Sequence, residues 1–139
     1  KISEKNERII EQSVSDFECI TKNDKKFKAS DFNKLHDESL NFLRQSSGHK
    51  KNKVVFVTHH VPSLYCNKPD HNNSSINEAF SVDLTDYIEK SNVSFWIYGH
   101  SHFNQKPLYI GKTILLTNQL GYIQLNEQDG FRLNAYFSV

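Results

Sequence analysis

The stretch VVFVTHHVPS, residues Val54–Ser63, decides the fold. Its opening apolar run consists of three valines and a phenylalanine, and two adjacent histidines and a proline follow. Short apolar runs rich in β-branched residues are typical of strands that are buried on both faces, as in parallel sheets. We therefore predict a buried strand over Val54–Thr58 that delivers His59 and His60 to a loop.

A second stretch, VSFWIYGHSH, repeats this pattern later in the chain. It predicts a strand over Val93–Tyr98 that ends at Gly99 and is followed by His100 and His102. In extended backbone, histidines two positions apart point to the same side. Because strand ends in α/β folds present side chains to a ligand crevice, we expect all four histidines near one edge of a sheet.

The segments around these strands alternate between helical and polar patterns. Ser30 is positioned to cap a helix that stops at the serines and glycine of Ser46–Gly48. Ser75 opens an S-I-N-E capping box before an apolar stripe that ends near Asn92. Around the two strands we expect the following elements: a helix over 30–46, solvated loops over 22–28, 49–53 and 62–74, a helix over 75–92, and three successive antiparallel strands in KTILLTN, GYIQLN and FRLNAYFSV.

Composition limits the class of protein. The chain has 139 residues, 37% of them hydrophobic and 24% charged, which fits one globular domain. A net charge of +1 gives no signal for a nucleic-acid partner or an anionic membrane. No apolar stretch approaches the roughly 18 residues of a membrane span, and no signal peptide is visible. Cys19 and Cys66 stand far apart without metal-site spacing, so we expect a reducing, cytoplasmic location.

Several of the seven histidines are candidate metal ligands. Neutral imidazole is a common protein ligand for zinc, iron, manganese and similar ions. His59, His100 and His102 follow predicted buried strands, so we predict that they bind metal. The remaining histidines outside these two stretches lie in a helix or in polar loops and are expected at the surface: His36, His49 and His71.

The motifs VVFVTHHVPS, FWIYGHSH and TILLTNQLGY resemble the last motifs of the calcineurin-like metallophosphoesterases, in the order and approximate spacing of that family. The resemblance runs from about Asp16 to Tyr122. It implies an α/β fold, the C-terminal half of a two-sheet α/β/β/α metallophosphoesterase sandwich. Residues 1–139 would then form a single partial domain.

The resemblance also implies a site with two divalent metal ions, of manganese, zinc, iron or nickel. By motif position, His59 and His100 would bind one ion and His102 the other. His60 and Asn118 would lie beside the metal ligands or toward the substrate. The expected activity is hydrolysis of a phosphoester, as a phosphatase or phosphodiesterase, with the ions activating water and polarising the phosphoryl group.

The chain departs from the family in its first half. The D-x-H, G-D-x-x-D and G-N-H-[DE] motifs, which supply the other ligands, the bridging aspartate and the catalytic histidine, do not occur before His59. The chain also lacks methionine. We therefore expect a missing N-terminal half that carries the catalytic residues, partial or no metal occupancy in this chain, and little activity of the chain alone.

Two other hypotheses about the function of the chain stay open. The chain could be a non-catalytic folded fragment or interaction module with a degenerate metal site. It could also be a hydrolase with a single metal ion that His59, His100 and His102 hold alone. In any of these cases a half-domain with an uncovered sheet edge is expected to pair with a copy of itself.

Overall fold

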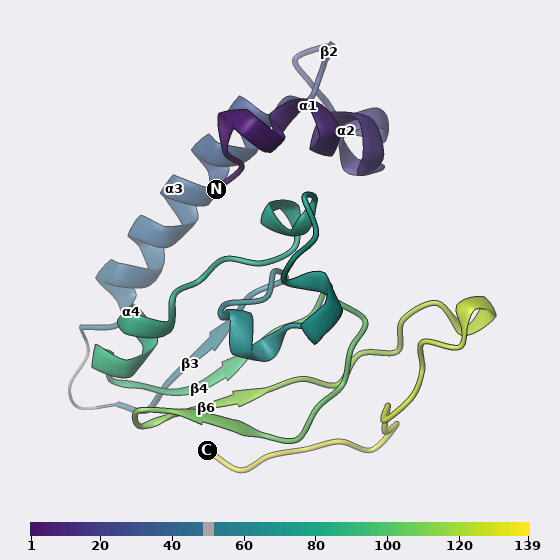
Figure 1. Ribbon diagram of the computed structural model, residues 1–139. Helices are drawn as coiled ribbons and strands as arrows, with labels where there is room; N and C mark the ends of the chain where they lie inside the picture. Colours follow the sequence, from purple (N-terminus) through teal and green to yellow (C-terminus); the bar gives the residue numbers. More distant parts are fainter. Residues whose placement is uncertain (49–51) are drawn as a thin grey trace.

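The computed structural model describes residues 1–48 and 52–139 and shows a mixed α/β fold. A helical unit from the first third of the chain lies over one side of a sheet formed by later residues (Figure 1). There are two sheets in the described residues, one of two strands and one of four. The expected α/β class is confirmed at this level.

The four-stranded sheet is mixed and has the order β3-β4-β6-β5. The strands β3 (Val54–Val57), β4 (Val93–Ile97) and β6 (Thr113–Leu116) run parallel to one another. The strand β5 (Leu108–Ile110) is antiparallel to β6 and forms the far edge. Both strands that were predicted to precede histidines are therefore present and adjacent.

The strand β3 lies at an edge of the sheet rather than in its middle. Phe56 is buried, but the Val57 side chain is 70% exposed, so the prediction of a strand buried on both faces is wrong. The run of β-branched residues predicts the strand correctly, but the burial of a strand depends on the elements that pack beside it. In the described part of the chain, β3 pairs only with β4.

The first predicted helix is confirmed as α3 (Ala29–Ser46), but its cap differs. Ser30 lies inside the first turn, and Lys28 is the capping residue. The Lys28 backbone N–H donates to Asp31 Oδ2 at 3.3 Å, and the Ala29 N–H donates to Glu11 Oε1 at 2.8 Å. A carboxylate from another helix thus satisfies a free N–H group at this terminus, which local sequence does not reveal.

The second predicted helix, over 75–92, is interrupted. A 3₁₀ turn, η3 (Asn77–Ala79), is followed by a β-bridge between Ser81 and Val61, and only then by α4 (Thr85–Lys90). The Val82 N–H donates to the Val61 carbonyl at 2.9 Å. Pairing with the segment after β3 therefore replaces the helical hydrogen bonds, and the capping box predicted at Ser75 does not form a continuous helix.

The C-terminal meander is also different from the prediction. Only KTILLTN forms a strand, β6, and it is parallel to β4. GYIQLN forms a 3₁₀ turn, η4 (Ile123–Leu125), and FRLNAYFSV contains no strand. The predicted loop over 62–74 contains two 3₁₀ turns, η1 (Leu64–Cys66) and η2 (Pro69–His71), and residues 49–51 of the predicted loop over 49–53 lie outside the described residues.

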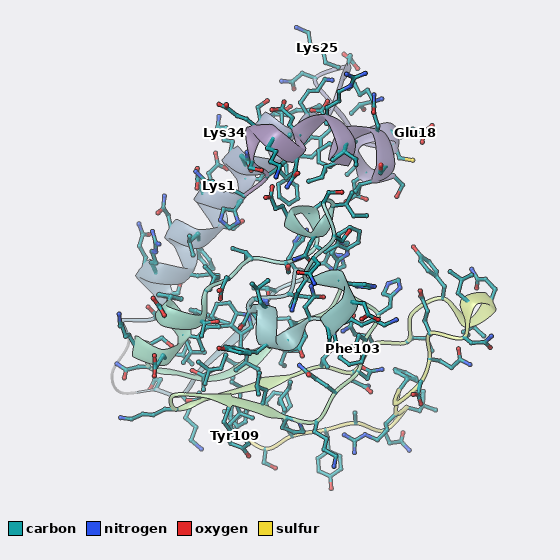
Figure 2. All side chains as sticks on the ribbon, in the orientation of Figure 1. Lys1, Glu18, Lys25, Lys34, Phe103 and Tyr109 are labelled. Atoms are coloured by element: carbon teal, nitrogen blue, oxygen red, sulfur yellow. The ribbon has the colours of Figure 1, made fainter. Side chains whose placement is uncertain are left out.

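The N-terminal unit consists of α1 (Glu4–Ser13), α2 (Asp16–Cys19), α3 and a short hairpin of β1 (Thr21–Lys22) and β2 (Lys25–Lys26). The hairpin occupies most of the solvated loop expected over 22–28, and Lys25 points outward at its tip (Figure 2), but Phe27 in this segment is buried in the core. No helix in the described part of the chain is long and apolar enough to cross a membrane.

Two clusters of buried side chains make up the core. The larger one joins the sheet, the loop after β3 and α4 around Trp96, and the smaller one joins the N-terminal helices around Phe17. The helix α3 touches the first cluster through Leu43 and the second through Phe32. Between these contacts lies a cavity of about 680 Å³, which we call the α3–β3 groove; its walls include Leu35, His36, Phe42, Val57, His59, His60 and Trp96.

Candidate functional site

The carboxyl ends of the three parallel strands bring the predicted site residues to one edge of the sheet. His59 and His60 follow β3, and His100 and His102 follow β4. The loops are tied together by backbone contacts, since the Gly99 N–H donates to the His59 carbonyl at 3.1 Å. Parallel strands end at a common edge, and this topology accounts for the gathering of residues that are far apart in the sequence.

Three imidazoles from these loops form a cluster. The ring centroids of His59 and His100 are 4.5 Å apart, those of His60 and His100 are 4.8 Å apart, and those of His59 and His60 are 5.4 Å apart. Aromatic rings support the cluster from outside: Phe80 stacks on His100 at 4.6 Å, and Phe32 packs edge-on against His60 at 5.5 Å. The rings are thus held in place by packing.

The electrostatics of the cluster favour neutral imidazoles. Burial, assisted by the neighbouring histidines, lowers the pKa of His60 from 6.5 to about 4, and that of His100 likewise to about 4. Both rings therefore keep an uncharged nitrogen lone pair at neutral pH, which is the form that binds metal. His60 Nε2 is also buried and has no hydrogen-bond partner among the described residues. A buried polar atom without a partner is costly unless something satisfies it.

These imidazoles fit the nitrogen part of a metal site but not a complete one. In residues 1–48 and 52–139, no group of three or more histidine, cysteine or acidic side chains is arranged to hold a metal ion. A pair of bridged ions needs carboxylate oxygens as well as imidazoles. The metal-binding roles of His59, His100 and His102 therefore stay predictions, as does the expected pair of divalent ions.

His102 lies in a different environment from the other predicted ligands. Its Nδ1 is 2.7 Å from Glu127 Oε2, and its ring packs perpendicular to that of Tyr122 with centroids 4.7 Å apart. A hydrogen bond from the Tyr122 N–H, together with the contact to His102, holds the pKa of the Glu127 carboxyl below its usual value.

The expectation that His100 and His102 share a side in extended backbone is wrong. Their φ angles are 71° and 48°, in the left-handed region that residues other than glycine rarely adopt. Each such residue costs of order 1 kcal/mol or more, and such strain clusters at functional sites. The turn directs His100 toward His59 and His102 toward Glu127.

The residue that organises this turn is Gln119, which the sequence analysis missed. Its side chain is buried, its Oε1 accepts the His102 N–H at 2.7 Å, and its Nε2 donates to the Phe103 carbonyl at 3.0 Å. Gln119 follows β6, the third parallel strand, so a polar residue just after that strand was the available signal.

The other predicted residues are placed as follows. Asn118 is exposed and forms two hydrogen bonds with the Arg132 backbone, each of 2.9 Å, so its side chain fastens the C-terminal segment; a place beside a metal stays a prediction. His71 is exposed, as expected, while His36 is half-buried in the α3–β3 groove. His49 lies outside the described residues.

In comparison with known proteins, the chain is similar in sequence to an uncharacterized viral protein. The chain is 32% identical over 149 residues to an uncharacterized protein of Acanthamoeba polyphaga mimivirus, and the match covers 99% of the chain and 52% of that relative. The chain thus spans about half the length of the curated relative that it matches. No protein-family profile matches the chain. No solved structure matches it either.

Proposed function

We propose that this chain contributes the C-terminal ligands of a metal-dependent phosphoester hydrolase, a phosphatase or phosphodiesterase of the two-sheet α/β/β/α type. The observation that carries the proposal is the approach of His59 and His100 to 4.5 Å between ring centroids, at the carboxyl ends of adjacent parallel strands. Two imidazoles from separate loops that meet at such an edge are a suitable start for a metal site.

Each residue has a defined part in this proposal. His59 and His100 would hold one divalent ion and His102 a second. The ions, when bound, supply Lewis acidity toward the phosphoryl oxygens and lower the pKa of bound water. The Phe80 ring keeps the His100 imidazole oriented and shields it from water, which preserves the lone pair. His60 packs between these ligands and α3.

The proposal requires further ligands, because the described residues form no group of three or more histidine, cysteine or acidic side chains that could hold a metal ion, and the Glu127 carboxylate contacts His102 alone. We infer that an N-terminal half of a longer protein supplies the remaining ligands and the catalytic residues. The match covers 52% of the mimivirus relative, so about half of that relative lies outside the match, which supports the proposal of a longer protein. Cys19 and Cys66 are free thiols in the structure, which fits the proposed cytoplasmic location.

The test compares the chain alone with the chain joined to that half. The 139-residue chain with added manganese or zinc should hydrolyse bis-p-nitrophenyl phosphate little or not at all. Addition of the N-terminal half should produce metal-dependent hydrolysis. In that assembly, His59→Ala, His100→Ala and His102→Ala should each lower kcat/KM by about 100-fold or more, because each removes a ligand.

His60→Ala should reduce the rate less, and the matched control His71→Ala should leave it unchanged, since His71 is exposed. Strong hydrolysis by the chain alone would contradict the need for a second half. An assembly in which His71 matters as much as His100 would show that the ligands are assigned wrongly.

A non-catalytic interaction module is the second candidate, and the incomplete ligand set among the described residues favours it. The two candidates differ in metal binding. The hydrolase requires that the assembled protein bind manganese or zinc and that His59→Ala and His100→Ala each weaken this binding. A module with a degenerate site requires neither effect.

A further inference from the structure

His102 is held on three sides by one short segment of the chain. Its backbone N–H donates to Gln119 Oε1 at 2.7 Å, its Nδ1 lies 2.7 Å from Glu127 Oε2, and its ring packs against Tyr122. The three partners come from residues 119–127, directly after β6. The side chains of His102 and Glu127 are both about one-third exposed, at 30% and 31%.

The turn after Gly121 is built around the Glu127 carboxylate. The Tyr122 N–H donates to Glu127 Oε2 at 2.8 Å, and the Glu127 N–H donates back to the Tyr122 carbonyl at 3.3 Å. Gly121 has a φ of +66°, and a Cβ there would lie 2.5 Å from Glu127 Cβ. Only glycine permits this approach, so the backbone itself fixes the position of the carboxylate.

A carboxylate at this distance from Nδ1 determines which imidazole nitrogen carries the proton. A carboxylate only accepts hydrogen bonds, so the neutral ring must place its proton on Nδ1. The lone pair then resides on Nε2, the nitrogen that faces away from Glu127. Histidines that bind metals commonly donate their other ring N–H to a carboxylate in this way.

We propose that Glu127 is a positioning residue that holds His102 in the Nδ1–H tautomer and leaves the Nε2 lone pair free for a divalent cation. The cation part rests on the proposed function, in which His102 is a metal ligand. The tautomer part rests on the contacts of Glu127 alone.

The tautomer is measurable without activity. In the 139-residue chain with isotopically labelled histidine, imidazole NMR at about pH 8.5, well above the ordinary histidine pKa, distinguishes the two neutral forms. The His102 signal is identified by its loss in His102→Ala. We expect the Nδ1–H form in the wild type and a shift to the Nε2–H form, which the free histidine side chain prefers in water, in Glu127→Ala.

Two further variants test this result, one that should reproduce the tautomer shift and one that serves as the control. Gly121→Ala leaves the carboxylate in the sequence but displaces it, and it should cause the same shift. Asp129→Ala removes an acidic side chain from the same segment but keeps the carbonyl that accepts from Asn104, and it should cause none. A wild-type His102 in the Nε2–H form, or one unaffected by Glu127→Ala, would overturn the proposal.

A zinc titration separates this inference from the proposed function. Zinc bound at His102 Nε2 should shift that resonance, and Glu127→Ala should weaken the effect about 10- to 100-fold. An Nδ1–H tautomer that depends on Glu127, with no response of His102 to zinc even in the assembly with the N-terminal half, would support the positioning role and contradict the metal role of His102.

Discussion

The two cysteines show how the fold sets the chemistry of single residues. Cys66 is fully buried in the sheet cluster, and burial raises the pKa of its thiol from 9.0 to about 11, although a hydrogen bond with Tyr98 opposes the rise. Cys19 is exposed at the end of α2. The thiolate is the reactive form, so the two residues should differ strongly in reactivity.

We expect dithiobisnitrobenzoate at neutral pH to label one thiol per native chain quickly, and Cys19→Ala to remove that reaction. Cys66 should react only when denaturant unfolds the chain. The control is Cys66→Ala, which should leave the fast reaction intact. Rapid labelling of Cys66 in the native Cys19→Ala chain would contradict its burial.

The raised pKa of Cys66 also predicts an alkaline dependence of stability. The folded state holds the thiol proton up to about pH 11, while the unfolded chain releases it near the ordinary thiol pKa of 9.0. Proton release then favours the unfolded state, so this contribution to the free energy of unfolding is present below pH 9.0 and falls as the pH rises from 9.0 toward 11. Denaturant titrations of the wild type and Cys66→Ala across this range measure the difference.

At the scale of elements, the turn between β5 and β6 depends on one glycine. Gly111 is the first of two turn residues and has a φ of +57°, as a type II′ hairpin turn requires. A Cβ at this position would lie 2.7 Å from the Glu89 carbonyl oxygen in α4. The glycine therefore serves both the turn and the close packing of the helix end.

Gly111→Ala should lower the free energy of unfolding by about 2 kcal/mol or more, because left-handed backbone and overpacking each cost of order 1 to 2 kcal/mol. Gly48→Ala is the matched control, since its added Cβ would lie 3.7 Å from the nearest atom and its φ is not positive. Denaturant unfolding of both variants makes the comparison. Equal stabilities would show that the turn does not constrain the fold.

The elements that could be predicted from the sequence are those that local pattern decides. The strands β3 and β4 and the helix α3 have long or strongly apolar signals, and they form within one or two residues of the predicted bounds. The predicted helix over 75–92 fails where Ser81 pairs with Val61, a contact 20 residues away that no helical period records. The strand β5 was missed because three residues after a proline carry too weak a pattern.

The candidate site, too, could be predicted only where local sequence pattern decides the structure. That His59 and His100 lie together could be predicted, because both follow strands that run parallel in one sheet. The separation of His102 could not, because it depends on left-handed backbone at two histidines and on Gln119 and Glu127, which contact His102 from 17 and 25 residues away. Such contacts exist only after the chain has folded.

At the scale of the whole molecule, the N-terminal helices pack against the segment between β3 and α4, because Ala79 lies in their core cluster and Ile76 and Phe80 contact it. Glu78 in η3 adds polar contacts to the N-terminal residues: its carboxylate accepts the Ser3 N–H at 2.6 Å and the Asn6 side-chain amide at 3.0 Å. Leu43 packs on the sheet cluster at the other end of α3. The α3–β3 groove lies between these attachments and is lined by Val57 of β3, the strand that ends the four-stranded sheet of the described residues.

This edge exposes apolar surface. Val57 is 70% exposed on β3, and Phe42 and Leu35 are 67% and 50% exposed on the facing helix. Uncovered edge strands with apolar side chains are templates for pairing with another strand, and charged side chains on such edges prevent it. We therefore keep the prediction that the isolated chain associates with a copy of itself through β3.

Val57→Lys should weaken this association at least about 10-fold, because pairing of two β3 edges would bring like charges together and remove them from water. Sedimentation velocity over a range of concentrations measures the effect. Leu133→Lys is the control, because Leu133 is 87% exposed and lies outside the sheet. The Leu133→Lys chain should therefore associate as the wild type does. A wild-type chain that stays monomeric at every concentration, or an equal loss in Leu133→Lys, would show that β3 is not the contact. If the proposed N-terminal half covers this edge, its addition should abolish self-association of the wild type. Val57→Lys should then bind the N-terminal half more weakly than the wild type does, because both contacts use the strand β3.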